Sequence, residues 1–514
     1  MLASPEIAGA VAPPPTRSSL PRESSALAGA AGVIGLDWPW HSHRQERRAM
    51  TVASIPSALF RPPRPAPHDG PMSALQLILT LRRNPLEIWS KAHYERPILI
   101  GRSILGERAV VSEPAAVRRV FLDNAANYRK DALQLRVLGP GLGRGLLTVD
   151  GEDWRAQRRA LAPLFSPRQI GGFAPAINRV AAAAAERLAP KREGRVVEVA
   201  QEMARVTLEV LEQTLFSQGL GRDASAFQLA VTRYFETIGR LDPLDLIGAP
   251  QFLPRLGRLR GRATLEFFAR AVDDIIGARK RLLESGAPPP NDILTLLLAA
   301  QDPETGKGIS DDDVRANIVT FIGAGHETTA NALTWTLYLL SQAPEWRARV
   351  EQEIDAQFRP ENGEAGADSL PVTRAVVEEA LRLYPPAANL SREAIGPDVL
   401  AGRRISPGTV VTVSPFLLHR HRLLWRDPDA FDPDRFLGPN RDAIDRYAYI
   451  PFGAGPRVCI GMGFAMLEMM TVLGHLLRAY RFDLAPGHPV TPVAHVTLRP
   501  AQGMKMILRR READ

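Results

Sequence analysis

Apolar residues recur at a spacing close to 3.6 along most of this 514-residue chain, and this spacing restricts the fold more than any other feature of the sequence. It predicts helices over residues 74–82, 85–95, 114–123, 151–164, 170–188, 198–216, 256–284 and 311–342. Shorter alternating stretches predict strands over residues 98–104, 108–112, 399–400 and 410–413. Because no internal segment has the composition of an interdomain linker, we expect one large, mainly α domain with a small β-sheet region.

The first part of the chain differs from the rest. Residues 1–49 mix Pro, Ala, Ser and Gly without a sustained period, so we expect a disordered, low-complexity extension. The apolar run 26–36 is shorter than the roughly 20 residues of a membrane span, and no small-residue cleavage site follows it. Met50 is a second plausible start. We assign residues 50–70 to a Pro-rich arm and residues 71–512 to the main domain.

Charge and cysteine content exclude several classes of protein. The chain has 64 Lys and Arg against 56 Asp and Glu, a net charge of +8 that is small for this length. No aromatic and basic stripe accompanies it, so nucleic-acid binding is not expected. The one cysteine, Cys459, excludes disulfide scaffolds, Cys-rich zinc sites and iron–sulfur clusters.

The surroundings of Cys459 favour chemistry over simple burial. Three nearby glycines permit unusual backbone angles, and an apolar helix is predicted directly after the cysteine. A helix N-terminus and the nearby cation Arg457 both stabilise a thiolate and lower a thiol pKa. A thiolate either attacks a substrate or holds a metal, and no protease signature surrounds this one.

The loop resembles the haem-binding signature of the cytochrome P450 family, Phe-x-x-Gly-x-Arg-x-Cys-x-Gly. Its fixed positions are Phe452, Gly455, Arg457, Cys459 and Gly461. The resemblance implies the cytochrome P450 fold, haem b as cofactor, and Cys459 as the axial ligand of the haem iron. It also implies a monooxygenase that uses O2 to hydroxylate a substrate.

A second group of residues resembles the family's contacts to the haem propionates. Trp154 and Arg158 are four apart on a predicted helix and share one face. Alone, this spacing is more typical of a surface cation over an aromatic ring. The resemblance implies that both bind a propionate, together with Arg392 and Arg457.

Glu379 and Arg382 stand three residues apart before a Pro-Pro pair. Such a pair is commonly a solvated surface contact. The resemblance instead implies a buried structural network of Glu379, Arg382 and Arg435.

The middle of the long segment 311–342 carries glycines and consecutive threonines, which are unfavourable in a helix. Two interpretations are open: a close helix crossing, or a local opening of the helix beside a ligand. The resemblance favours the second. It implies that Ala324 and Gly325 pass over the haem, that Thr328 hydrogen-bonds dioxygen, and that Glu327 delivers protons. His326 has no second histidine at zinc-site spacing and is expected to face away from the ring.

The same resemblance implies electrons from separate chains, a ferredoxin and its ferredoxin reductase, and a cytoplasmic enzyme with no membrane span. Arg155 and Arg159 are candidate contacts for an acidic partner. The substrate is expected to be a hydrophobic small molecule, bound by segments near 133–146, 235–254, 387–390 and 493–497. The alternatives are a peroxide-driven or isomerising haem-thiolate enzyme and a non-enzymatic haem sensor.

Overall fold

The computed structural model describes residues 59–103, 106–189, 194–217, 256–358 and 369–511, with a few isolated positions between 231 and 249. The expected extension 1–49 and most of the expected pocket segment 235–254 lie outside the described residues. In the described part, helices predominate. Those of the first half are α1 (Ala74–Arg83), α2 (Pro114–Arg118), α3 (Ala132–Leu142), α4 (Gly151–Leu161), α5 (Pro167–Leu188), α6 (Val199–Leu211) and α8 (Pro243–Leu246). Those of the second half are α9 (Leu256–Glu284), α10 (Ile293–Leu298), α11 (Asp311–Gln342), α12 (Pro344–Gln357), α13 (Pro371–Leu383), α14 (Pro415–Leu418), α15 (Gly438–Asp442) and α16 (Met462–Ala479).

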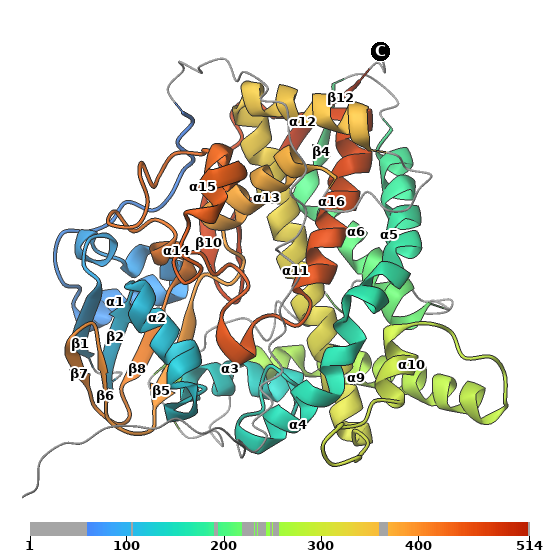
Figure 1. Ribbon diagram of the computed structural model, residues 1–514, viewed down its shortest axis with the longest axis horizontal. Helices are drawn as coiled ribbons and strands as arrows, with labels where there is room; N and C mark the ends of the chain where they lie inside the picture. The colour runs from blue at the N-terminus through green and yellow to red at the C-terminus, as the bar shows by residue number, and fades with distance from the viewer. Residues whose placement is uncertain are drawn as a thin grey trace, which may run out of the picture. The chain divides into compact units, whose positions relative to one another are not determined.

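Helix α11 runs through the middle of the helical part and packs against α6, α13 and α16 (Figure 1). Ser310 caps its first turn, where the Oγ accepts the backbone N–H of Asp313. The C-terminal half of α11 is buried on all sides, and its polar residues form hydrogen bonds within the helix. The hydroxyls of Thr334 and Thr336 each donate to the carbonyl four residues back, so they enter the core without an unmet hydrogen bond.

The strands of the described residues form four small sheets. Their bounds are β1 (Ile98–Ser103), β2 (Gly106–Val111), β3 (Tyr128–Arg129), β4 (Arg195–Glu198), β5 (Leu390–Ala394), β6 (Asp398–Leu400), β7 (Arg403–Ile405), β8 (Val410–Val413), β9 (Tyr480–Leu484), β10 (Pro492–Ala494), β11 (Leu498–Pro500) and β12 (Lys505–Arg510). The largest has the order β1-β2-β8-β5-β3, with only β2 and β8 parallel, and lies to one side of the helices in Figure 1. The predicted strands 399–400 and 410–413 belong to different sheets, since β6 pairs with β7.

The predicted helix over 85–95 is wrong. The chain there forms two short 3₁₀ turns, Pro85–Ile88 and Lys91–Tyr94, separated by extended residues. The N–H of Lys91 donates to the carbonyl of His68 and not to a carbonyl of its own segment, so it is not available for a helical hydrogen bond. The spacing of apolar residues does not show that a distant carbonyl competes for this N–H.

The Pro-rich arm docks on the domain along its described part. The backbone N–H of Phe431 donates to the carbonyl of Phe60, and the hydroxyl of Tyr384 donates to the carbonyl of Pro63, both at 2.8 Å. Arg64 pairs with Asp429 at 2.7 Å. These contacts tie the arm to the end of α13 and to the segment that follows α14.

Candidate active site

The loop before α16 holds Cys459 through its own backbone. The N–H of Cys459 donates to the carbonyl of Phe452 at 2.9 Å, which closes the loop. Gly455 has a φ of +69°, and a Cβ there would lie 1.8 Å from the backbone oxygen of Phe121. Only glycine allows the loop to approach this closely. Gly461 then caps α16 at its N-terminus.

Cys459 is an exposed residue. Protein nevertheless surrounds it, and this burial raises its pKa, while the Gly461 N–H and the Arg158 cation act in the opposite direction. Cys459 thus keeps exposed surface although protein atoms lie around its sulfur. The sequence predicted a lowered pKa, and that prediction is wrong for the protein alone because the desolvation of the thiolate was not visible in the sequence. A coordinated metal would deprotonate the thiol outright.

A cluster of buried cations lies beside this loop. Arg457 forms an ion pair with Asp150, and its guanidinium lies 4.2 Å from the centre of the Trp154 ring. Burial, with the neighbouring Arg457 charge, lowers the pKa of Arg392 to about 10. Burial, followed by the charges of Arg457 and Arg392, lowers the pKa of Lys130 to about 7.

This cluster fits an anionic ligand. Nη1 of Arg457 is buried and has no hydrogen-bond partner among the described residues. Like charges that depress one another's pKa values are relieved when an anion binds among them. The two propionates of haem are such a ligand, and the accessible thiol nearby is the kind of donor that haem iron takes. The residues present therefore fit haem.

Lys130 and Asp150 were missed from the sequence. The backbone N–H of Lys130 donates to Asp150 Oδ2 at 2.7 Å, and the Lys130 ammonium donates to the carbonyl of Leu146 at 3.2 Å. Asp150 is the N-cap of α4, which the Asp-Gly start of that helix could have indicated. Nothing in the sequence around Lys130 distinguishes it from a surface lysine.

Arg158 occupies a different position from the other predicted propionate contacts. Burial lowers the pKa of its guanidinium, and the opposing influence comes from Cys459 rather than from the cation cluster. The structure thus brings Trp154, Arg392 and Arg457 together and places Arg158 toward the sulfur.

Helix α11 is continuous through residues 323–329, so the expected local opening is absent from this described helix. Ala324 is exposed although the flanking Ile322 and His326 are buried, so a small surface opens in the middle of a core helix. The Thr328 hydroxyl donates to the carbonyl of Ala324 at 2.5 Å.

The structure gives Gly325 a different explanation from the predicted one. A Cβ there would lie 3.2 Å from Leu211 Cδ2, so this glycine permits the close crossing of α6 and α11. His326 is buried on the same side, where Thr207 donates to its carbonyl at 3.0 Å, and burial lowers its pKa to about 4. Two residues along a helix point to opposite faces, so His326 lies away from Ala324.

Glu327 is held by the loop that precedes β11. Its Oε1 accepts the hydroxyl of Thr497 at 2.6 Å and lies 3.8 Å from Arg499 Nη1. This part of the expected pocket segment 493–497 therefore contacts the acid that was predicted to deliver protons.

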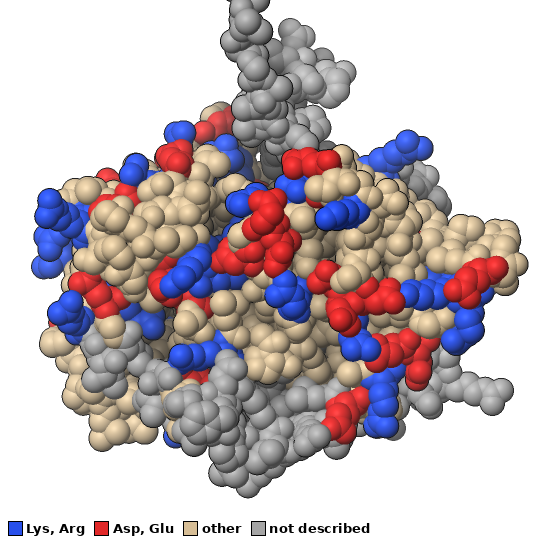
Figure 2. All heavy atoms as spheres, turned by 90° about the horizontal axis from the view of Figure 1, so that it is seen from below, with Lys and Arg blue, Asp and Glu red and all other residues tan. Residues whose placement is uncertain are grey.

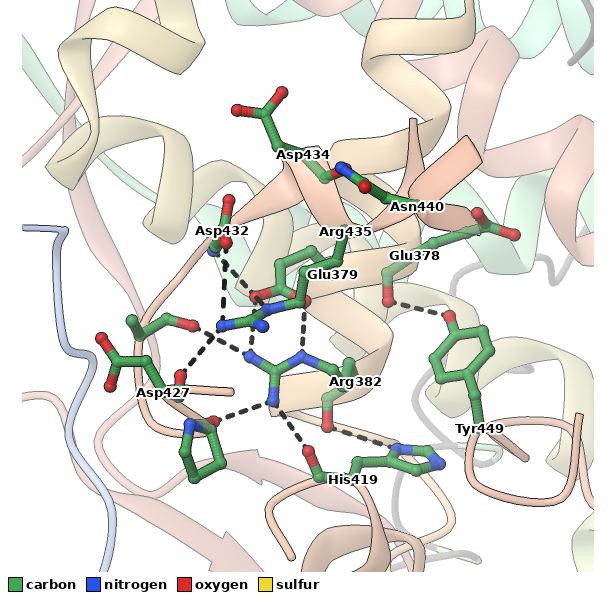
Figure 3. A network of polar contacts seen from close by, with 12 residues as sticks. Glu378, Glu379, Arg382, His419, Asp427, Asp432, Asp434, Arg435, Asn440 and Tyr449 are labelled. Carbon is green, nitrogen blue, oxygen red and sulfur yellow. Dashed lines mark hydrogen bonds and ion pairs between the residues drawn. The ribbon is translucent and has the colours of Figure 1, made fainter. Parts of the chain in front are cut away.

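The structure brings Glu379, Arg382 and Arg435 together in one buried network (Figure 3). Arg382 donates to both carboxylate oxygens of Glu379, at 2.5 and 2.7 Å, and both side chains are fully buried. Arg435 Nε lies 3.7 Å from Glu379 Oε1. The remaining donors of Arg382 bond to the backbone carbonyls of His419, Pro428 and Ala430.

The cytochrome P450 family model matches residues 63–508. The chain belongs to the cytochrome P450 family. It is 32% identical over 452 residues to cyclooctat-9-en-7-ol 5-monooxygenase of Streptomyces melanosporofaciens, which covers 86% of this chain and 95% of that relative. It is 32% identical over 445 residues to cyclooctatin synthase of the same organism, covering 84% and 93%.

A solved structure confirms the predicted fold class. The haem domain of cytochrome P450DA superposes with a TM-score of 0.73 at 27% identity, over 88% of this chain and 99% of that one. The chain is thus a cytochrome P450 monooxygenase, an oxidoreductase of a family that binds haem and requires O2 and redox partners. None of the helices described here is long and apolar enough to cross a membrane.

The candidate partner contacts on α4 are already paired within the chain. Arg155 pairs with Glu152 at 2.8 Å, and Arg159 donates two hydrogen bonds to Asp302, each of 2.8 Å. Blue and red side chains alternate over the face seen in Figure 2 and form no single basic patch there. Each of these arginines thus has a carboxylate partner within the chain.

Proposed function

We propose that this cytochrome P450 inserts one oxygen atom of O2 into a C–H bond of a hydrophobic small molecule. The balanced reaction is RH + O2 + 2e⁻ + 2H⁺ → ROH + H2O, with the electrons from a separate ferredoxin and ferredoxin reductase. The observation that carries the proposal is the accessible Cys459 thiol, held inside the protein at the N-terminus of α16. When bound, haem b supplies the oxygen activation, and a thiolate ligand favours O–O cleavage.

The residues of the chain divide the work of binding the cofactor. Cys459 would hold the iron, and the hydrogen bond from its backbone N–H to the carbonyl of Phe452 fixes the loop that carries its sulfur. Lys130, Arg392 and Arg457 bind the propionates, and Trp154 braces the Arg457 guanidinium from one side. Gly461 stabilises the thiolate through its backbone N–H.

The residues of α11 organise the reaction. Ala324 is small and exposed, so it would leave room for haem and substrate beside α11. Glu327 moves protons between water and the site. The Thr328 hydroxyl orients the water molecule that donates them. In the structure the Thr328 hydroxyl donates to Ala324, so its oxygen keeps lone pairs that can accept a water proton.

The substrate is a hydrophobic small molecule such as a terpene, a fatty acid or an aromatic compound. One relative is named as the 5-monooxygenase of cyclooctat-9-en-7-ol, an alkenol, which is consistent with a hydrophobic substrate. The domain assignment 71–512, the arm 50–70 and a cytoplasmic location are part of the same proposal.

A reduced carbon monoxide spectrum tests the central step. We expect the red-shifted Soret peak of a thiolate-bound haem in the native chain and its loss in Cys459→Ser. Turnover then separates the alternatives. The proposal requires product that depends on O2 and reduced ferredoxin, and Thr328→Ala should consume electrons with less product. Product formed from peroxide without reductant, or substrate-free gas binding without product, would instead support the two alternatives.

A further inference from the structure

A polar contact joins α11 to the C-terminal β10–β11 hairpin. Glu327 and Asn331 are four residues apart and share one face of α11. The buried Thr497 lies against that face, with its hydroxyl donating to Glu327 Oε1 at 2.6 Å. Asn331 Nδ2 donates to the same hydroxyl oxygen at 3.2 Å. Because a hydroxyl has one proton, these two partners fix its direction toward the carboxylate.

The hairpin that carries Thr497 is itself anchored. The buried Asn84 amide donates to the carbonyl of Pro492 at 3.0 Å and accepts the N–H of Ala494 at 3.3 Å. The N–H of Leu498 donates to the carbonyl of Pro386 at 2.9 Å. Thr497 therefore presents its hydroxyl from a rigid support rather than from a mobile loop.

The second contact of Glu327 is weaker. Arg499 Nη1 is 3.8 Å from Oε1, and the Arg499 and Glu327 side chains are 42% and 26% exposed. An exposed ion pair of this length contributes little because water screens it and two long side chains must be ordered. The short hydrogen bond from the buried Thr497 therefore determines the orientation of the carboxylate.

We propose that Thr497 is a positioning residue of the oxygenation reaction, which holds the Glu327 carboxylate in one rotamer for proton delivery. Thr497 and Arg499 both contact Oε1 of Glu327. Among the described residues, Oε2 has no hydrogen-bond partner. Oε2 thus exchanges protons with water while Oε1 stays bound to the hairpin. This inference rests on the proposed role of Glu327 and adds the group that places it.

The substitution Thr497→Val tests the inference, because valine keeps the shape and removes the donor. We expect normal haem content and a normal carbon monoxide spectrum, several-fold less product per electron pair, and a larger solvent deuterium isotope effect. Thr497→Ser, which keeps the hydroxyl, should retain the normal amount of product per electron pair, which we call coupling. The control Thr336→Val removes a buried hydroxyl of α11 that bonds only within its own helix, and it should leave coupling unchanged.

A measurement independent of turnover is a double-mutant cycle of thermal unfolding. We expect the shifts in unfolding midpoint of Thr497→Val and Glu327→Leu to sum to more than the shift of the double variant, because leucine has no acceptor and each substitution removes the same bond. Additive shifts would overturn the inference. If Thr497→Val stays coupled while Glu327→Gln is uncoupled, the positioning role alone fails. If Glu327→Gln is itself fully coupled, the proton-delivery role in the proposed function fails first.

Discussion

Glu379 and Arg382 face each other one turn apart on α13, joined by two hydrogen bonds and fully buried. Removing one member of a buried ion pair costs about 3–5 kcal/mol, because the other charge stays buried without its partner. We therefore expect Glu379→Ala to yield little or no haem-loaded protein, measured by the haem-to-protein absorbance ratio and by thermal unfolding.

The chain offers a matched control for this prediction. Arg155 and Glu152 form an ion pair at the same three-residue separation on α4, with side chains 54% and 69% exposed. Arg155→Ala should change the unfolding free energy by less than about 1 kcal/mol, since water replaces the contact. A normal haem content in Glu379→Ala would show that burial of this pair does not support the fold.

Two glycines of the cysteine loop should respond differently to alanine. Both have positive φ, +76° at Gly453 and +69° at Gly455. A Cβ on Gly453 meets nothing nearer than 3.8 Å, so Gly453→Ala should cost only the left-handed backbone strain of about 1–2 kcal/mol. A Cβ on Gly455 would overlap the oxygen of Phe121, so Gly455→Ala should abolish the carbon monoxide spectrum of a thiolate-bound haem. Equal losses in the two variants would contradict the steric argument.

The long helices could be predicted closely from the sequence. The apolar spacing gave the bounds of α9 and α11 as observed, because a long buried or half-buried helix repeats its pattern over many turns. The short segment 85–95 could not, since its backbone bonds to the arm through His68. Local spacing carries no information about such distant partners.

The candidate site shows the same division. Cys459 and its loop follow from a contiguous motif, whereas Lys130 joins the cluster only because the fold brings it beside Arg392 and Arg457. The pKa of the thiol depends on the protein packed around it, which the sequence does not specify. Likewise, the sequence predicts that Gly325 passes over the haem, whereas in the structure the side chain of Leu211 lies against Gly325.

Lys130 should make the stability of the haem-free protein depend on pH. Its pKa falls from the ordinary 10.5 to about 7, so between these values the unfolded chain binds more protons than the folded one. The unfolding free energy should therefore rise with pH from about 7 toward 10.5. Lys130→Met should flatten that rise, measured by urea unfolding at pH 7, 8 and 9. If the unfolding free energy of Lys130→Met rises with pH as steeply as that of the native chain, Lys130 is not part of the buried cluster.

Lys130 should also discriminate between two porphyrins. A hydrogen bond to a charged group contributes about 1.5–3 kcal/mol, so Lys130→Met should weaken haem binding by roughly ten- to a hundredfold. Haem dimethyl ester lacks the propionate charges, so its affinity should be the same for both proteins. Equal weakening with both porphyrins would mean that Lys130 supports the pocket and not the propionates.

Asn317 should hold the segment before α4 against α11. Its Oδ1 accepts the N–H of Leu146 at 2.9 Å, and its Nδ2 donates to Gln157 Oε1 at 3.2 Å and to the carbonyl of Asp313 at 2.8 Å. The side chain is fully buried. Asn317→Ala removes the acceptor of the Leu146 N–H and the donor to Gln157 Oε1, and both of these groups lie in the interior. We expect a loss of about 1–3 kcal/mol for each unsatisfied group.

The position of Asn317 predicts a second effect besides lower stability. Lys130 donates to the carbonyl of the same Leu146, so release of this segment removes one restraint on the lysine that we assign to a propionate. Asn317→Ala should therefore lose haem faster to apomyoglobin than the native protein does. Thr334→Val, which removes a buried α11 hydroxyl bonded only to Ala330, is the matched control and should retain haem normally. Equal haem loss in the two variants would mean that any polar deletion in α11 loosens the site, and the specific tie through Leu146 would be refuted.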